Sequence, residues 1–219
     1  MRFYPLLMAL LLFTATADAQ QSCGGDFGAW KTAVEKEAAA QGVGERGIAA
    51  LDQATFNAEV VRRDHAQGVF TQTFIEFSTR MESAYRLKHG EANLKKYAAV
   101  FQRAEQQFGV PGPVIAAFWG LETDCGAVQG DFSTLDALAT LAHDCRRPDL
   151  FRPQLIALLK LIDNGTVLAD VRGAWAGEIG QTQMLPKDYL EQGVDGDGDG
   201  RVDLRASAAD VIMTAGHFL

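Results

Sequence analysis

Apolar residues recur every three or four positions over most of this chain, which is the spacing of one buried helix face. Gly109 and the pair Asn164-Gly165 are typical helix ends, and convincing strand signals are scarce. The pattern predicts helices over residues 26–38, 48–51, 73–87, 94–108, 111–126, 150–162 and from 208 onward. We therefore predict an all-α fold built as one domain.

The composition is that of an ordinary soluble globular protein. Of the 219 residues, 47% are hydrophobic and 22% are charged, which excludes a wholly disordered chain and a protein with several membrane spans. Lys and Arg number 20 against 28 Asp and Glu, which gives a net charge of −8. An acidic chain of this kind is poorly suited to nucleic acid, so we expect no nucleic-acid partner.

The first 19 residues have the organisation of a secretory signal peptide. Arg2 precedes an apolar run over residues 6–13, and the small-residue pattern that follows ends at Ala19, where we predict cleavage. A membrane anchor is the alternative interpretation, but the run is far shorter than the roughly 20 residues that span a bilayer. We therefore expect residues 20–219 to be exported without a membrane span.

Export places three cysteines in a compartment where disulfides persist. Their number is odd, so at least one of Cys23, Cys125 and Cys145 stays free or pairs with another chain. Cys125 and Cys145 are the candidate pair, since a bridge across their 20-residue separation could contribute roughly 3 kcal/mol. The alternative is two buried thiols at these positions.

The predicted helix over residues 111–126 carries a glutamate among large apolar residues. Ile115, Phe118, Trp119 and Glu122 follow one another at helical spacing, so they share one stripe. Apolar burial and the negative end of the helix dipole would both raise the pKa of Glu122. A carboxyl group that stays protonated near neutral pH can serve as a general acid. The alternative is a glutamate that faces solvent or pairs with an arginine.

A second candidate segment covers residues 173–186 and is rich in glycine, alanine and glutamine. Trp175 offers a flat aromatic face, and Gln181 and Gln183 offer amide donors and acceptors, a combination that suits a sugar. A tight packing turn between helices is the competing interpretation. Glu178 is a rival carboxylate in this segment, although its spacing does not predict burial.

The third candidate is an acidic loop over residues 195–206 that matches the EF-hand calcium loop. Ala206 stands at position 12, where the EF-hand has a bidentate glutamate, so the last ligand must come from elsewhere. Asp210 on the following helix is the candidate for it. The predicted ligands of a structural Ca²⁺ ion are Asp195, Asp197, Asp199, Arg201, Asp203 and Asp210.

Together, these motifs resemble the lytic murein transglycosylase B family of bacterial cell-wall enzymes. The resemblance rests on the order and spacing of residues 118–123, 135–141, 173–186 and 195–204, and residues 61–67 look like part of the family's N-terminal lobe. It implies a lysozyme-like transglycosylase fold. An N-terminal helical lobe would cover residues 26–90, and a catalytic core residues 91–219.

The resemblance also implies a reaction. The family cleaves the β-1,4 bond between N-acetylmuramic acid and N-acetylglucosamine in peptidoglycan without water, leaving 1,6-anhydromuramoyl ends. Glu122 matches its single catalytic acid/base and Gln183 matches a glutamine of its sugar-binding cleft, while Trp119, Trp175 and Gln181 are further candidates for substrate binding. The expected partner is a peptidoglycan glycan strand in the bacterial periplasm, bound by a monomer.

The sequence departs from the family pattern at three points. Ala174 stands where family members carry a serine that assists the catalytic glutamate, and Cys145 stands where an aromatic residue is common. A further helical segment that completes the family's cleft is not found, so we expect the domain to be incomplete at its C-terminus. The alternative functions are a non-catalytic, calcium-stabilised peptidoglycan-binding protein and a lysozyme-type hydrolase.

Overall fold

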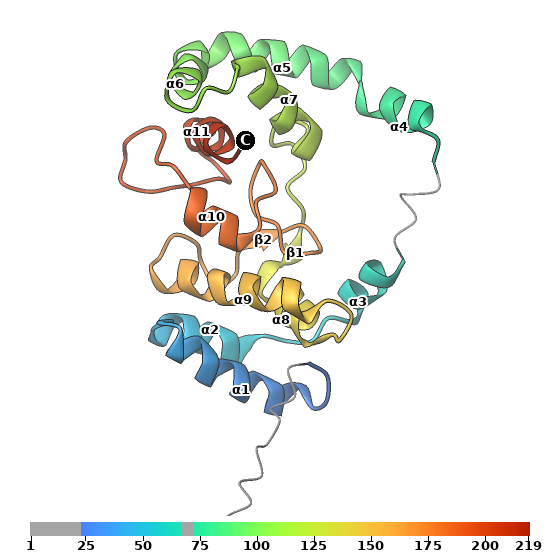
Figure 1. Cartoon of the computed structure of the whole chain (residues 1–219), viewed down its shortest axis with the longest axis vertical. Coiled ribbons are helices and arrows are strands. Elements are labelled where there is room, and N and C mark those ends of the chain that lie inside the picture. Colours follow the sequence, from blue (N-terminus) through green and yellow to red (C-terminus); the bar gives the residue numbers. More distant parts are fainter. Residues whose placement is uncertain (1–22, 67–71) are drawn as a thin grey trace, which may run out of the picture.

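Helices make up most of the computed structural model, which describes residues 23–66 and 72–219 (Figure 1). The predicted signal peptide lies outside these ranges. The helices are α1 (Phe27–Ala40), α2 (Glu45–Gln53), α3 (Ala58–His65), α4 (Phe74–Met81), α5 (Ala84–Lys96), α6 (Ala98–Phe108), α7 (Gly112–Thr123), α8 (Thr134–His143), α9 (Pro148–Asp163), α10 (Pro186–Gln192) and α11 (Ala208–Phe218). Two-residue strands β1 (Phe132–Ser133) and β2 (Arg172–Gly173) pair antiparallel.

The helix boundaries follow local sequence signals. The Asp26 side chain caps α1 by accepting a hydrogen bond from the Ala29 amide at 2.8 Å, and Gly109 ends α6 with a φ of 78°. The predicted helix over residues 73–87 is interrupted, because Ser83 caps a new helix through the Arg86 amide. Tyr97 likewise separates α5 from α6 inside the predicted helix over residues 94–108.

The larger core lies around α8 and α9, against which α1, α2 and α10 pack. Both helices are buried on nearly every side, and Leu138, Leu155 and Leu158 are completely buried. Burying one such side chain contributes about 1.5–3 kcal/mol relative to its exposure. The buried Gln154 accepts a hydrogen bond from the Lys187 amide at 2.9 Å, which joins α9 to the start of α10.

A second, smaller core joins α6, α7 and α11. Phe101, Ile115, Trp119 and Ile212 fill it, and Gly216 allows α11 to approach the other two helices closely, since a Cβ there would lie 3.2 Å from Ile115. Helix α5 packs across the outer side of α7. This core therefore holds the helix that carries Glu122.

The expected N-terminal lobe over residues 26–90 needs correction. Helices α1 and α2 pack in the larger core, and α3 packs on α8, whereas α5 packs on α6 and α7 (Figure 1). The helices of residues 26–90 therefore pack against elements far along the chain, divided between the two cores, and do not form a unit of their own.

The predicted disulfide between Cys125 and Cys145 is also wrong. Cys145 pairs with Cys23, whose Cα lies 5.1 Å away although the two are 122 residues apart in sequence. The Gly24 amide donates to the carbonyl of His143 at 2.7 Å, which brings the start of the described chain to the end of α8. Cys125 is a half-buried free thiol beyond the end of α7, and burial raises its pKa.

Within the described ranges, no helix combines the length and the apolar character needed to cross a bilayer.

Candidate active site

Glu122 lies in the last turn of α7 and is exposed to solvent. The prediction that it shares a buried stripe with Trp119 is therefore wrong. The buried stripe passes through Ile115, Trp119 and Thr123, and Glu122 lies one position before it, beside the half-buried Phe118. The helix thus presents the carboxyl group at the edge of its buried face, where a ligand can reach it.

The surroundings of Glu122 still favour its protonated form. Partial desolvation by the nearby protein raises the pKa of this carboxyl group, and the negative charge of Glu178 raises it further. Among the residues that the structure describes, no basic side chain forms an ion pair with Glu122. Arg86 binds Asp124 instead, with 2.6 Å between Nε and Oδ1. Glu122 therefore has the properties of an acid that can give its proton to a bound molecule.

Hydrogen bonds from α7 to Gln181 join the end of this helix to the glycine-rich segment. The Trp119 indole donates to Gln181 Oε1 at 3.0 Å, and the Thr123 hydroxyl donates to the Gln181 carbonyl oxygen. The Gln181 amide group in turn donates to the carbonyl of Arg205 at 3.0 Å. Trp119 and Gln181 are both buried, and the hydrogen bond between them pairs the indole N–H with the amide oxygen. Their expected role in binding sugar therefore needs correction: they join α7 to the glycine-rich segment and expose no surface to a ligand.

Close packing explains the glycines of the segment. A Cβ at Gly173 would collide with the carbonyl oxygen of Glu178, and one at Gly177, which has a φ of 95°, would collide with Leu138. These glycines bring the backbone close to other parts of the protein, as the packing-turn interpretation predicts. The segment is therefore a rigid wall beside α7.

The side chains of Trp175 and Gln183 remain partly exposed to solvent at this wall. Both are half-buried, and Trp175 packs against the larger core. Gln183 has a φ of 50°, and its amide nitrogen donates to the carbonyl of Gly180 at 3.0 Å. These contacts leave the two residues as candidates for binding a sugar.

Glu178 is the rival carboxylate of the glycine-rich segment, and its burial was not predicted from the sequence. Its side chain is largely buried, and desolvation raises its pKa, while hydrogen bonds from the backbone amides of Glu178 and Ala176 and the charge of Arg147 oppose that rise. The only sequence signal was a charged residue inside a run of glycine and alanine. Its charge raises the pKa of Glu122 through the tertiary structure, because the two positions are 56 residues apart in sequence.

Arg147 belongs to a partly exposed ionic cluster next to the disulfide. It binds Asp64, which is buried and also accepts from Arg146 at 2.7 Å. Asp144 pairs with His65 at 2.9 Å in the same region. The carboxylate of Asp64 is neutralised by two arginines, so this cluster is an ion-pair network and a poor metal site.

The acidic loop brings three of its predicted ligands together. Carboxylate oxygens of Asp195, Asp197 and Asp210 lie within 4.8 Å of one another, and Asp210 is buried. Hydrogen bonds from the Gly196 and Asp203 amides, at 2.7 and 2.6 Å, fix the Asp210 carboxylate. Such a set of hard oxygen donors fits Ca²⁺.

Asp199 and Asp203 do not join this group. Asp199 accepts from the Arg201 amide at 2.8 Å, and Asp203 accepts from the Arg205 and Ala206 amides at 2.9 and 3.0 Å. Both side chains thereby order the turns on either side of Arg201.

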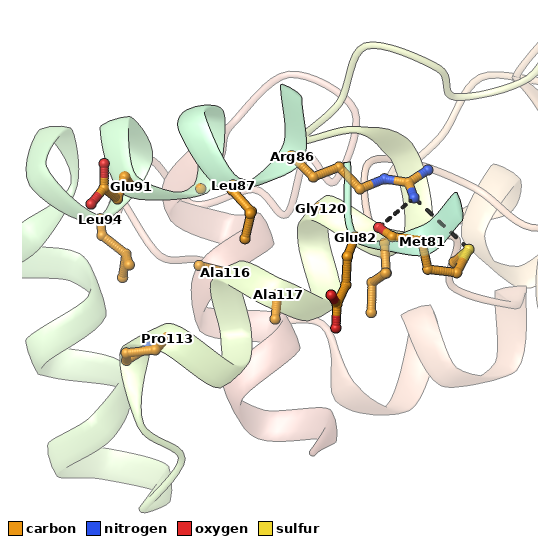
Figure 2. A pocket seen from close by; sticks show the side chains of 12 residues that line it. Met81, Glu82, Arg86, Leu87, Glu91, Leu94, Pro113, Ala116, Ala117 and Gly120 are labelled. Atoms are coloured by element: carbon orange, nitrogen blue, oxygen red, sulfur yellow. Dashed lines mark hydrogen bonds between the residues drawn. The ribbon is translucent and has the colours of Figure 1, made fainter. Parts of the chain in front are cut away.

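A separate apolar pocket of about 330 Å³ lies between α5 and α7 (Figure 2). Leu87 and Leu94 line it from one helix, and Ala116 and Leu121 line it from the other. Arg86 is turned along its rim toward the carbonyl of Met81, at 2.9 Å. None of the candidate site residues lines this pocket, so it is a different surface from the one around Glu122.

The chain is similar to known transglycosylases in sequence. Residues 26–219 match the family described as Transglycosylase SLT domain. Over 134 residues the chain is 34% identical to the membrane-bound lytic murein transglycosylase B of Escherichia coli (strain K12), an alignment that covers 60% of this chain and 37% of that relative.

Solved structures show the same likeness in three dimensions. SltB3 from Pseudomonas aeruginosa, in complex with NAG-anhNAM-pentapeptide, matches 89% of this chain with a TM-score of 0.83 and 31% identity. The Escherichia coli lytic transglycosylase Slt35, in complex with calcium, matches 90% with a TM-score of 0.78 and 27% identity. The chain spans 37% of the curated relative's length and 52% and 64% of the lengths of these two structures.

These matches confirm the predicted all-α, lysozyme-like transglycosylase fold. The family match extends from the start of α1 through α11 and includes Glu122, the glycine-rich segment and the acidic loop. The chain therefore belongs to the Transglycosylase SLT domain family.

Proposed function

We propose that this chain acts as a peptidoglycan lytic transglycosylase with Glu122 as its single acid/base. The observation that carries the proposal is a carboxyl group with a raised pKa and no cationic partner among the described residues, presented at the end of α7 beside the glycine-rich wall. The substrate bond is the β-1,4 linkage between N-acetylmuramic acid and N-acetylglucosamine. The ligand bound to SltB3, NAG-anhNAM-pentapeptide, contains an anhydro sugar, which agrees with this reaction.

Glu122 acts in two steps. Its carboxyl group first protonates the glycosidic oxygen, and the bond from that oxygen to C1 of the muramoyl residue breaks. The resulting carboxylate then takes the proton of the muramoyl C6 hydroxyl while this oxygen forms a bond to C1. The products are a free hydroxyl on N-acetylglucosamine and a 1,6-anhydromuramoyl end, and Glu122 is protonated again.

Trp175 and Gln183 are the proposed sugar contacts, since both keep side-chain surface at the wall. Asp195, Asp197 and Asp210, with the Arg201 carbonyl, are the proposed ligands of a Ca²⁺ ion that stabilises the fold. Asp199 and Asp203 support that loop through their hydrogen bonds. The proposed place of action is the bacterial periplasm, after removal of residues 1–19.

Product analysis tests this function. The purified chain is incubated with sacculi or purified muropeptides, and the soluble products are examined by mass spectrometry. We expect 1,6-anhydromuramoyl ends. Reducing ends that have gained water would instead show a lysozyme-type hydrolase, a second candidate that the carboxyl group of Glu178 near Glu122 favours, because ordinary glycosidases use two carboxylates. Sacculus binding without soluble products would support the non-catalytic alternative.

A further inference from the structure

Helix α4 is amphipathic, yet none of its residues is buried. Phe74, Phe77 and Met81 follow one another at helical spacing, so they share one stripe of the helix. Glu76 and Arg80 lie on the opposite side. A surface helix normally packs its apolar stripe against a core. The stripe of α4 lacks such a cover among the residues that the structure describes.

The exposed apolar side chains of this region are large. Phe74 is 78% and Ile75 is 69% exposed, and Phe77 is exposed as well. Beyond the cap at Ser83, Leu87 of α5 is 68% exposed. Helix α4 lies at an outer corner of the molecule, past the start of α5 (Figure 1). It therefore forms a projection that carries bulky apolar side chains.

The apolar surface continues from α4 along α5. Met81 ends α4 and lines the apolar pocket between α5 and α7, as do Leu87 and Leu94 of α5 (Figure 2). Arg86 lies in the same row but is engaged, because it binds Asp124 and the carbonyl of Met81. The apolar surface thus spans two consecutive helices, which is more than one stray exposed side chain.

The same segment is the basic part of an acidic chain. Residues 72–97 contain five Lys and Arg against three Glu, a net charge of +2, whereas the whole chain carries −8. Lys88 and Lys95 are exposed on α5, and no described carboxylate forms an ion pair with either. The excess of positive charge remains although Glu82 and Glu91 belong to the segment. An anionic surface is therefore attracted to this part of the protein.

We propose that α4 and the adjoining part of α5 dock on a bilayer that contains anionic phospholipid. An amphipathic helix with bulky apolar side chains and nearby lysines is suited to the boundary between headgroups and acyl chains. Phe74, Ile75 and Phe77 enter that boundary, and Lys88 and Lys95 lie at the lipid phosphates. The eight residues of α4 are too few to span a bilayer, so the helix lies on the surface.

Charge favours a lipid surface over a second copy of this chain. A symmetric dimer brings the same patch of both copies together, and here it would oppose two segments of net positive charge. Anionic lipid instead neutralises them. The inference stands apart from the proposed catalytic function, because it concerns a different surface from the one around Glu122.

Vesicle binding tests the proposal. The exported chain, residues 20–219, is sedimented with vesicles of phosphatidylcholine alone and with vesicles of equal parts phosphatidylcholine and anionic phosphatidylglycerol. We expect binding to the mixed vesicles that weakens as salt is added, because salt screens the lysines. Binding to phosphatidylcholine alone should be much weaker.

Two double variants separate the apolar and the charged contributions. Phe74→Gln with Phe77→Gln removes the apolar side chains and keeps good helix formers, so binding to mixed vesicles should fall by roughly tenfold or more. Lys88→Gln with Lys95→Gln should weaken that binding by roughly tenfold and leave binding to phosphatidylcholine unchanged.

Matched controls lie outside the patch. Leu168→Gln removes an apolar side chain that is 68% exposed, and Lys36→Gln removes an exposed charge of α1; both should bind like the wild type. Circular dichroism verifies that each variant is folded. Wild-type protein that does not bind mixed vesicles overturns the proposal, and so does undiminished binding by folded Phe74→Gln with Phe77→Gln. A dimer in sedimentation velocity that these two substitutions dissociate, without vesicle binding, would assign the face to a second copy.

Fluorescence gives a second measurement that keeps the side chain aromatic. Phe74→Trp should bind like the wild type, and lipids brominated on their acyl chains should quench the added tryptophan. Leu168→Trp is the control and should show no quenching beyond that of the wild type. An unquenched tryptophan in vesicle-bound Phe74→Trp would contradict insertion of α4.

Discussion

The indole nitrogen of Trp119 donates to Gln181 Oε1 at 3.0 Å, and both side chains are buried. Through this bond the helix that carries Glu122 and the wall that carries Glu178 form one site. The same glutamine donates from its amide nitrogen to the carbonyl of Arg205, at the end of the acidic loop. One buried side chain therefore connects the three segments that the sequence singled out.

Replacing Trp119 by Phe should destabilise the protein. The ring still fills most of the core, but Gln181 Oε1 loses its donor and stays buried. Such a loss costs about 1–3 kcal/mol of unfolding free energy. Urea denaturation followed by circular dichroism measures it, with Gln102→Ala on the exposed face of α6 as the control. Equal stability of both variants would show that the bond does not hold the site together.

Glu122→Gln should strongly slow the formation of anhydro products while the protein stays folded. The amide cannot donate an acid proton, and an exposed glutamine at this position disturbs no packing. We expect the rate of sacculus solubilisation to fall by roughly 10²–10⁴-fold, the usual contribution of a general acid. Glu105→Gln, at an exposed position of α6, is the matched control. Near-normal turnover by folded Glu122→Gln would assign the acid to another residue.

Removing calcium should lower the melting temperature. Asp195, Asp197 and Asp210 repel one another when no cation lies between them, and an ion that binds only the folded chain stabilises it. Differential scanning calorimetry with Ca²⁺ and with a chelator measures this difference. In Asp195→Asn the difference should shrink, whereas in Asp188→Asn, outside the loop, it should persist. Identical melting curves for the wild type under both conditions would exclude a calcium site here.

Reduction should destabilise the chain through Cys23 and Cys145. Their bridge closes a loop of more than 100 residues, for which the expected contribution is about 2–4 kcal/mol. Cys145→Ser should have the same effect, and Cys125→Ser should have little. Alkylation of the unfolded, unreduced protein followed by mass spectrometry checks the pairing. A label on Cys125 alone is expected, and a label on Cys23 alone would instead indicate the Cys125–Cys145 bridge.

The stability of the protein should fall as pH rises above the ordinary range of a glutamate. Desolvation raises the pKa of Glu178 above 4.5, so the folded chain holds a proton that the unfolded chain has released. Unfolding then becomes easier as pH rises through the raised pKa. Melting temperatures recorded from pH 4.5 toward neutrality should decline less in Glu178→Gln than in the wild type. A parallel decline would mean that Glu178 does not contribute.

The sequence by itself determined the helical character of the chain and several helix ends. Asp26 and Gly109 act on the residues next to them, so their effects could be read locally, whereas the breaks at Ser83 and Tyr97 were missed. It also identified Glu122, the glycine-rich segment and the acidic loop, because each has a pattern within a few residues. The all-α prediction was confirmed because helical spacing of apolar residues is also a local pattern.

Only the tertiary structure decided which of these residues meet. Cys145 pairs with Cys23 across 122 residues, Trp119 turns inward to Gln181, and the charge of Glu178 raises the pKa of Glu122. Helical periodicity places a side chain on one face of its helix. It does not say which other part of the chain covers that face. Burial, disulfide pairing and the pKa of a carboxyl group depend on that covering, and it is fixed only when distant segments pack together.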